Sequence, residues 1–323
     1  METELQKKIC SSVRFMGLKM MLLRAVFAFL LSYAITPAAK SLSLCMGAMD
    51  KPDGYRKVNT TLMPRLGGLG FFLASMLVLF PLIKESPTVC ALLAGGAVLM
   101  TGGVADDTYG LSPTVKLLIQ CAAALVAITF VGIPEYLSFF GMITIKLSGF
   151  AGAVIAFFRM VFTVNAVNFS DGLDGLASGI SAVALLSLSV YGAWWGNPVP
   201  SLAALVLGCA TLGFIPHNRY RAKIFMGDCG SQFLGLSIAL LSLGTSPKGT
   251  FTLETALFLA IPTLDTAFAV MRRIISGKSP FSADKGHLHH LLLKVGVSHP
   301  MAVKILVFAS ALIASMTLII MRA

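Results

Sequence analysis

The chain has 323 residues, of which 56% are hydrophobic and only 12% charged, and its mean hydropathy is +0.85. Soluble domains carry roughly 25% charged residues, so this composition excludes an ordinary soluble globule, a disordered chain and a collagen-like fibre. Apolar runs of about 18 residues or more recur along the chain, which is typical of a polytopic membrane protein. We therefore expect a single all-α membrane domain over residues 1–323.

The net charge of +11, from 25 Lys and Arg against 14 Asp and Glu, suits loops near anionic lipid and an anionic substrate. No basic stripe is interleaved with stacking aromatics, so we expect no nucleic acid partner. The six cysteines form no CxxC pair and indicate neither a disulfide framework nor a zinc knuckle. The apolar stretch from Leu18 is long enough to span, so we expect no cleavable signal peptide.

Ten apolar segments are candidate transmembrane helices. They cover 18–38, 66–83, 88–105, 114–131, 150–167, 173–193, 199–216, 230–245, 253–271 and 301–321. Several are short for a hydrocarbon core of roughly 30 Å. Residues 132–149, with β-branched and aromatic residues around Gly141, favour a small extracytoplasmic β-hairpin, and residues 1–17 favour an amphipathic interfacial segment.

Alternating spans sort the loops onto two faces. The first face carries 39–65, 106–113, 168–172, 217–229 and 272–300 and holds most of the Lys and Arg, whereas the opposite loops hold only Lys84, Lys146 and Lys248. The positive-inside rule makes the first face cytoplasmic. The basic N-terminal segment falls on the other side, so either it lies flat at the interface or the first span is misplaced.

The carboxylates, amides and imidazoles gather on the same face as the basic loops. A transporter would more often place such groups near the middle of the membrane and break its helices there. We therefore expect a site where the cytoplasmic ends of several helices meet water.

Two motifs supply paired acids at helix ends. Asp106 and Asp107 end the third span and could hold Mg²⁺, orient a phosphate nucleophile or accept a proton, although a solvated helix end is the simpler alternative. The run from Asn165 to Gly175 alternates amides and carboxylates with glycines, which let backbone approach a ligand closely. A capped turn is the alternative there.

Two further motifs lie in the basic loops. Asp228 stands between glycines at the start of the eighth span, where it could be a metal ligand beside helix N-terminal amides that favour phosphate, or only an N-cap. His287, His289 and His290 follow a basic loop, where imidazole groups suit diphosphate oxygens better than zinc. Together the motifs indicate Mg²⁺-dependent phosphoryl transfer between a diphosphate donor and a substrate from the bilayer.

The stretches GGVADDTYGLSP, NAVNFSDGLDGLASG, AKIFMGDCGSQFLG and SPFSADKGHLHHLLL, with DKPDGYRKVNTTLMPRLGGLGFF, resemble the polyprenyl-phosphate N-acetylhexosamine-1-phosphate transferases of glycosyltransferase family 4. The resemblance runs from about residue 45 to 295. The HLHH form and the MPRLGG loop are similar to bacterial enzymes that start teichoic acid, enterobacterial common antigen or O-antigen synthesis.

The resemblance implies a ten- or eleven-helix enzyme of the bacterial plasma membrane with a cytoplasmic active site. It would transfer GlcNAc-1-phosphate from UDP-GlcNAc to undecaprenyl phosphate, release UMP and use Mg²⁺, with Mn²⁺ as a substitute. UDP-GalNAc as donor, a transporter of sugar nucleotide or lipid, and a non-catalytic scaffold stay as alternatives. Membrane lipids surround the chain, and a homodimer stays an option.

The resemblance also assigns residues. Asp106, Asp107, His289 and His290 match catalytic positions, Asn168 and Asp228 match metal-associated positions, and the substrate-binding set comprises Lys57, Arg65, Asp171, Gly172, Asp174, Asn218, Phe225 and His287. Phe225 is expected near uracil. Two departures are Asn59, where related sequences often have His, and Cys229, where Thr is usual. We expect direct attack by the lipid phosphate, with a covalent aspartyl-phosphate as the rival route.

Overall fold

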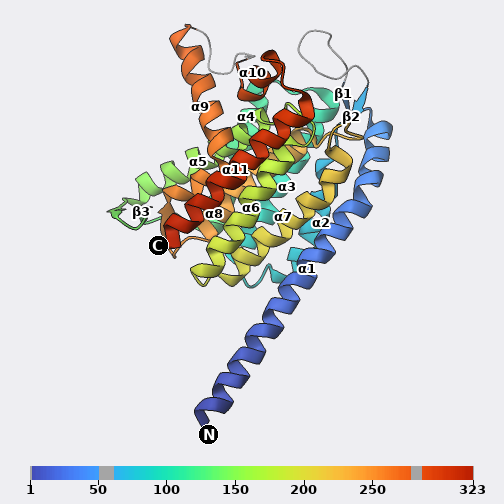
Figure 1. Ribbon diagram of the computed structural model, residues 1–323. Coiled ribbons are helices and arrows are strands. Elements are labelled where there is room, and N and C mark those ends of the chain that lie inside the picture. Colours follow the sequence, from blue (N-terminus) through green and yellow to red (C-terminus); the bar gives the residue numbers. More distant parts are fainter. Residues whose placement is uncertain (1, 51–61, 278–285, 323) are drawn as a thin grey trace.

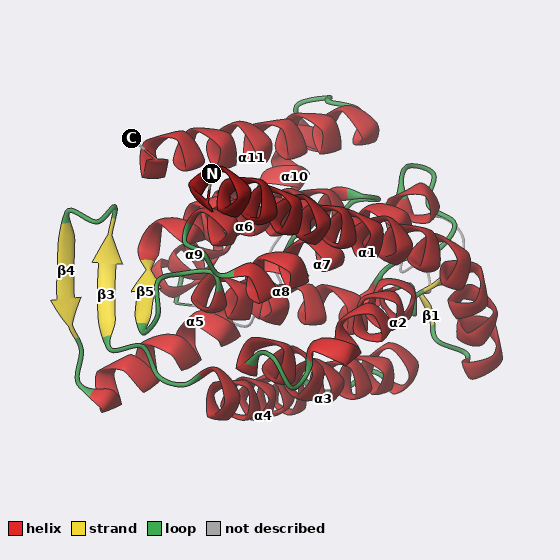
Figure 2. Ribbon diagram, turned by 90° about the horizontal axis from the view of Figure 1, so that it is seen from below, coloured by secondary structure: helices red, strands yellow, loops and turns green. Residues whose placement is uncertain are grey.

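The structure is a computed structural model and describes residues 2–50, 62–277 and 286–322. Helices form one bundle with small strands at its edges (Figures 1 and 2). The helices are α1 (Glu2–Met46), α2 (Gly68–Leu79), η1 (Phe80–Leu82), α3 (Pro87–Tyr109), α4 (Pro113–Val131), α5 (Gly149–Phe169), α6 (Leu176–Trp194), α7 (Pro198–Asn218), α8 (Gly227–Gly244), η2 (Leu253–Leu259), α9 (Ala260–Ile275), α10 (Leu288–Lys294) and α11 (His299–Arg322). The strands are β1 (Met49–Asp50), β2 (Met63–Pro64), β3 (Tyr136–Phe139), β4 (Ile143–Lys146) and β5 (Thr250–Thr252).

All ten predicted spans correspond to helical segments, and the predicted all-α polytopic membrane fold is confirmed. Within the described ranges, eight helical segments are long and apolar enough to cross a membrane. The other two predicted spans, 66–83 and 230–245, are not among these eight, for separate reasons. Residues 68–82 form a shorter apolar helix, and α8 carries Asp228 and Gln232 in its first two turns, which lowers its hydropathy. The chain is therefore a multi-pass membrane protein.

The N-terminal segment, for which an amphipathic interfacial position is predicted, is continuous with the first predicted span. Residues 2–17 belong to α1, which runs unbroken for 45 residues. At 1.5 Å per residue this is about 68 Å, more than twice the thickness of a hydrocarbon core. The N-terminal part of α1 projects away from the bundle at the end remote from α10 (Figure 1). Residues 2–36 contain no proline that would interrupt the helix. Pro37 lies within the helix and does not end it.

The predicted hairpin is present, and it is joined by a strand that the sequence did not indicate. β3 and β4 pair antiparallel with Leu137 opposite Ile145. β5 adds to the other edge of β3 in parallel, with Leu137 opposite Phe251. β5, which follows α8, therefore completes a three-stranded sheet in the order β4-β3-β5. This sheet lies far from β1 and β2 in Figures 1 and 2.

Helix α8 lies inside the bundle and packs against α3 and α5. Its approach to its neighbours is possible only because glycines stand at the contacts. A methyl group on Gly103 of α3 would lie 2.3 Å from Cys229 Cα, and one on Gly68 of α2 would lie 2.4 Å from Gly230 Cα. The N-terminus of α8 is thereby held directly against α2 and α3, which positions Asp228.

Replacing Gly103 should show how much this contact matters. Gly103→Ala should lower the unfolding temperature of the purified protein in detergent, because α3 and α8 must separate to admit the methyl group, and such overpacking costs about 1–3 kcal/mol. The matched control is Gly149→Ala, because a methyl group there meets no atom within 4 Å. Equal unfolding temperatures for the two variants would contradict the close packing.

Candidate functional site

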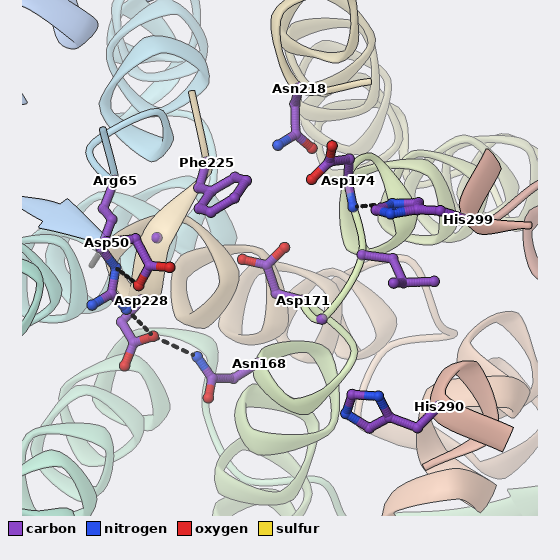
Figure 3. A pocket seen from close by; sticks show the side chains of 13 residues that line it. Asp50, Arg65, Asn168, Asp171, Asp174, Asn218, Phe225, Asp228, His290 and His299 are labelled. Carbon is purple, nitrogen blue, oxygen red and sulfur yellow. Dashed lines mark hydrogen bonds and ion pairs between the residues drawn. The ribbon is translucent and has the colours of Figure 1, made fainter. Parts of the chain in front are cut away.

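Loops at one end of the bundle converge on a cavity of about 260 Å³. Figure 3 shows side chains from α5, α7, α8, the turn before α6 and the start of α11 pointing toward it. The lining residues are Asp50, Arg65, Asn168, Asp171, Gly172, Leu173, Asp174, Asn218, Phe225, Gly227, Asp228, His290 and His299. Segments more than 200 residues apart in the sequence thus share one polar chamber.

Asp228 is the charged centre of this chamber. Its Oδ2 lies 2.8 Å from Lys116 Nζ, and its Oδ1 lies 3.6 Å from Arg65 Nη2. The Asn168 side chain donates to the same Oδ1 at 3.2 Å and to Ser231 Oγ at 2.8 Å. One carboxylate therefore joins α4, α5, α8 and the segment that leads into α2.

Asp107 lies beneath Asp228, and its side chain is fully buried. Its two oxygens accept the backbone N–H groups of Asp228 and Cys229 at 3.0 and 3.1 Å. These are among the first N–H groups of α8, which have no partner within the helix. Arg65 Nε lies 3.2 Å from the same carboxylate. Asp107 thus caps α8 and fixes the position from which Asp228 projects.

Asp106, the residue before Asp107 in α3, pairs with Lys116. The Lys116 Nζ lies 2.5 Å from Asp106 Oδ2, while Asp106 Oδ1 accepts the backbone N–H of Leu111 at 2.7 Å. Lys116 therefore bridges Asp106 and Asp228. Lys116 was not among the residues that the sequence assigned to the site, because nothing in one sequence shows which carboxylate a lysine contacts.

The turn between α5 and α6 forms the opposite wall. Asp174 Oδ2 accepts the backbone N–H of Ala222 at 3.0 Å, and the Asp174 N–H donates to His299 Nε2 at 2.9 Å. Asn218 accepts from Gly175 N–H and Ser178 Oγ and donates to the Ile224 carbonyl. The amide of Asn218 is therefore used to hold the two loops together, although the residue borders the cavity.

Asp171 faces the cavity from this turn (Figure 3). Burial, and then the neighbouring Asp228 carboxylate, raise the pKa of Asp171 to about 8. Repulsion between carboxylates of this kind is relieved when a cation lies between them. A cation bound between Asp171 and Asp228 would favour the ionised form of both carboxylates.

The three histidines do not share one environment. His290 borders the cavity, whereas His287 and His289 are buried behind it. The rings of His287 and His289 are nearly parallel, with centroids 5.9 Å apart, and a methyl group on Gly172 would lie 2.3 Å from His289 Nε2. His289 therefore packs directly on the cavity wall formed by Gly172.

Asp265 of α9 anchors the histidine segment. Its Oδ2 lies 2.8 Å from His287 Nδ1, and its Oδ1 accepts the backbone N–H of Leu288 at 2.9 Å. The sequence analysis missed this residue. The available signal was a carboxylate well inside the predicted span 253–271, which is costly unless it finds a partner.

The structure brings most of the predicted site residues together. Nine of them line the cavity: Arg65, Asn168, Asp171, Gly172, Asp174, Asn218, Phe225, Asp228 and His290. Asp106, Asp107, His287 and His289 lie behind the lining and support it. Lys57 and Asn59 lie outside the described residues. Residues that the sequence analysis did not assign are Asp50, Lys116, Asp265 and His299.

The polar lining of the cavity suits the expected Mg²⁺. The donors that face the chamber include carboxylates and an amide, which suits a hard cation. Within the described ranges, no three His, Cys, Asp or Glu residues form a cluster that could hold a metal. Mg²⁺ takes one or two carboxylates together with substrate phosphates, and the Asp228 carboxylate beside the Asn168 amide offers donors of this kind.

Comparison with known proteins adds independent information. Residues 89–246 match the family model described as glycosyl transferase family 4. A probable undecaprenyl-phosphate N-acetylglucosaminyl 1-phosphate transferase of Bacillus subtilis is 35% identical, with 93% of this chain and 86% of the relative covered. A decaprenyl-phosphate N-acetylglucosaminephosphotransferase of Mycobacterium tuberculosis is 35% identical, with 86% and 77% covered. The undecaprenyl-phosphate alpha-N-acetylglucosaminyl 1-phosphate transferase of Escherichia coli K12 is 32% identical, with the same coverage.

The Asp265 anchor predicts a stability effect. Asp265→Ala leaves the buried His287 Nδ1 and the Leu288 N–H without their acceptor, and each such group costs about 1–3 kcal/mol. The unfolding temperature in detergent should fall clearly. Glu85→Ala is the control, because Glu85 is exposed in the loop before α3. Equal unfolding temperatures for the two variants would mean that Asp265 does not hold α10.

The burial of His289 predicts a pH effect. Burial, and then the neighbouring His290 and His287, lower the pKa of His289 from 6.5 to about 4. Between these values the unfolded chain binds the proton more readily, so the free energy of unfolding should decrease as pH falls from 6.5 toward 4.

His289→Gln should reduce this decrease, because the variant has no imidazole to protonate. Unfolding temperatures of both proteins at pH 7, 6, 5 and 4.5 measure the two slopes. Identical slopes would contradict the burial of a neutral His289.

Proposed function

Because the chain belongs to glycosyl transferase family 4, we propose that it transfers N-acetylglucosamine 1-phosphate from UDP-GlcNAc to undecaprenyl phosphate and releases UMP. Its relatives are named for N-acetylglucosaminyl 1-phosphate transfer to undecaprenyl or decaprenyl phosphate. The chain itself is a multi-pass membrane phosphotransferase. We propose UDP-GlcNAc as the donor, UMP as the nucleotide product and cell-envelope polysaccharide synthesis as the pathway.

The observation that carries the proposal is the joining of Asp106, Asp107 and Asp228 by two cations at the cavity. Lys116 and Arg65 hold these three carboxylates together, with Asp228 and Arg65 facing the chamber and Asp106 and Asp107 behind its lining. An anionic lipid phosphate must approach an anionic diphosphate in this reaction, so repulsion is the main barrier. The three carboxylates outnumber the two cations, so a divalent cation bound beside Arg65 and Lys116 would be needed to offset this repulsion.

The acceptor phosphate does not need a strong base. The second pKa of a phosphate monoester is about 6, so it is mostly dianionic at neutral pH. We assign Lys116, held by Asp106, to orient this phosphate for attack. Asp107 is committed to the N–H groups of α8 and acts as a positioning residue. The electron pair of a phosphate oxygen forms the new P–O bond, and the bond to UMP breaks.

The donor fits the opposite side of the cavity. Phe225 offers an aromatic face for uracil, and the turn from Asp171 to Asp174 provides polar contacts for the nucleoside. His290 lies on the cavity wall, where it can donate to diphosphate oxygens. His289 supports that wall from behind through Gly172.

Mg²⁺, or Mn²⁺ in its place, is proposed as the cofactor. Asp228, Asn168 and Asp171 are the residues that would hold it, and the bound ion would neutralise charge on the donor diphosphate. The raised pKa of Asp171 and the hydrogen bond between Asn168 and Asp228 support this assignment. Lys116 and Arg65 would keep Asp228 in position.

The site is proposed to face the cytoplasm of the bacterial plasma membrane. The basic residues that favour this face under the positive-inside rule include Arg65, Lys116, Arg219 and Lys304. The product would be the first lipid-linked intermediate of a cell-envelope polysaccharide such as teichoic acid or O-antigen. A homodimer stays a prediction.

The direct test uses purified protein with undecaprenyl phosphate, Mg²⁺ and UDP-GlcNAc. We expect UMP and a lipid-linked diphosphate sugar in equal amounts. A parallel reaction with UDP-GalNAc measures donor preference. Flux of sugar nucleotide across vesicles without UMP would favour a transporter, and a sugar-phosphorylated enzyme formed without the lipid would favour a covalent route.

A substitution of Asp228 gives the most direct test of the proposed site. Asp228→Asn keeps the shape but removes the charge shared by Lys116 and Arg65, and we expect transfer to fall by roughly a hundredfold to a thousandfold. The matched control is Glu85→Gln, which makes the same chemical change on an exposed residue. Full activity of Asp228→Asn at unchanged Mg²⁺ concentration would refute the assignment.

A further inference from the structure

A second cavity, of about 330 Å³, lies on the outer side of the turn that walls the site. It is an open cavity bordered by α6, the end of α7 and the start of α11. The lining residues are Asp174, Gly175, Gly179, Ile215, Arg219, Tyr220, Pro300, Val303, Lys304 and Val307. Asp174 is the residue that borders both cavities.

The two cavities differ in chemistry. The inner surface of the second is apolar, with Ile215, Val303 and Val307 as its walls. Gly179 leaves the room for Val307, because a methyl group there would lie 2.8 Å from Val307 Cγ2. A sugar nucleotide would lose its hydration in such a cavity without gaining hydrogen bonds, so a polar donor is a poor occupant.

Two cations stand beside this apolar surface. Arg219 and Lys304 are both exposed, and neither forms an ion pair with any carboxylate in the described ranges. The third ionisable neighbour, Asp174, is already engaged by the backbone N–H of Ala222. An apolar cavity bordered by unpaired cations is complementary to an amphiphile with an anionic head.

The cavity also lies where a lipid can reach it. It is formed at the ends of α6, α7 and α11, all three of which are long and apolar enough to span a membrane. Most of α11 is not covered by the rest of the chain, so this helix presents its side chains to lipid. The basic ends of such helices lie at the headgroup level of the leaflet.

We propose that this cavity binds an anionic phospholipid of the surrounding bilayer. An acyl chain would pack against Val303 and Val307, and the headgroup phosphate would lie between Arg219 and Lys304. The acceptor lipid is the wrong occupant, because its phosphate must reach the Lys116 and Asp228 region. Figure 3 places Asp174 and His299 on the side of the chamber opposite to Asp228 and Arg65.

The bound lipid would contact the helix that braces the site. The first residue of α11 is His299, which accepts the N–H of Asp174. Pro300, Val303 and Lys304 of the same helix line the second cavity. The lipid and the donor would therefore lie on two sides of the same turn.

A fluorescence experiment on the full chain can test binding without an activity assay. Trp194 and Trp195 are the only tryptophans, so Trp194→Phe and Trp195→Phe remove the background. Tyr220→Trp then places one indole in the wall of the cavity. The protein is reconstituted in phosphatidylcholine vesicles that contain a small fraction of bromine-labelled phosphatidylglycerol or bromine-labelled phosphatidylcholine.

We expect the labelled phosphatidylglycerol to quench the indole at a mole fraction about tenfold lower than the labelled phosphatidylcholine. Arg219→Gln combined with Lys304→Gln should abolish this difference. Lys84→Gln combined with Lys248→Gln is the control, because it removes the same charge from exposed loops elsewhere and should leave the difference intact.

Three outcomes would overturn the proposal. The first is equal quenching by the two labelled lipids. The second is a preference for phosphatidylglycerol that survives removal of Arg219 and Lys304. The third is relief of quenching by trace undecaprenyl phosphate but not by unlabelled phosphatidylglycerol, which would assign the cavity to the acceptor. None of these depends on the proposed reaction.

Discussion

The structure depends on the neutralisation of one largely buried carboxylate, Asp228, at the N-terminus of α8. Taking a charge out of water costs several kcal/mol unless partners replace the lost hydration. Lys116 and Arg65 provide those partners, and Asp107 accepts the N–H groups on which α8 begins. Removing Lys116, Arg65 or Asp107 would leave a charge or a backbone N–H of α8 without its partner. The same contacts therefore stabilise the fold and position the site.

This arrangement links chemistry to helix packing. Glycines at 68, 103 and 230 bring α2, α3 and α8 into backbone contact, and this closeness allows Asp107 to reach the N–H groups of Asp228 and Cys229. The histidine segment is fixed in a different way. Asp265 in α9 holds both the His287 ring and the start of α10, so the far end of the chain is attached to the same chamber.

The two ends of the bundle are chemically unequal. One end carries the cavity and the paired carboxylates, whereas the hairpin end carries the small sheet of β3, β4 and β5. A phosphotransferase that joins a water-soluble donor to a bilayer acceptor requires such an asymmetry. One substrate must come from water and the other from lipid, and their phosphates must meet at the boundary. The proposed phospholipid site uses the same boundary on the outer side of the Asp174 turn.

The sequence alone determined the class of protein, the ten helical segments, the hairpin and the face on which the polar residues gather. These follow from hydropathy, from the length of each apolar run and from the charge of the loops, which are local properties. Tertiary structure decided what no local pattern contains. It paired Lys116 with Asp228, turned Asp107 into a helix cap, used Asn218 within the scaffold, and joined Asp265 to His287. Those pairings connect residues 22 to 121 positions apart, and only packing brings them into contact.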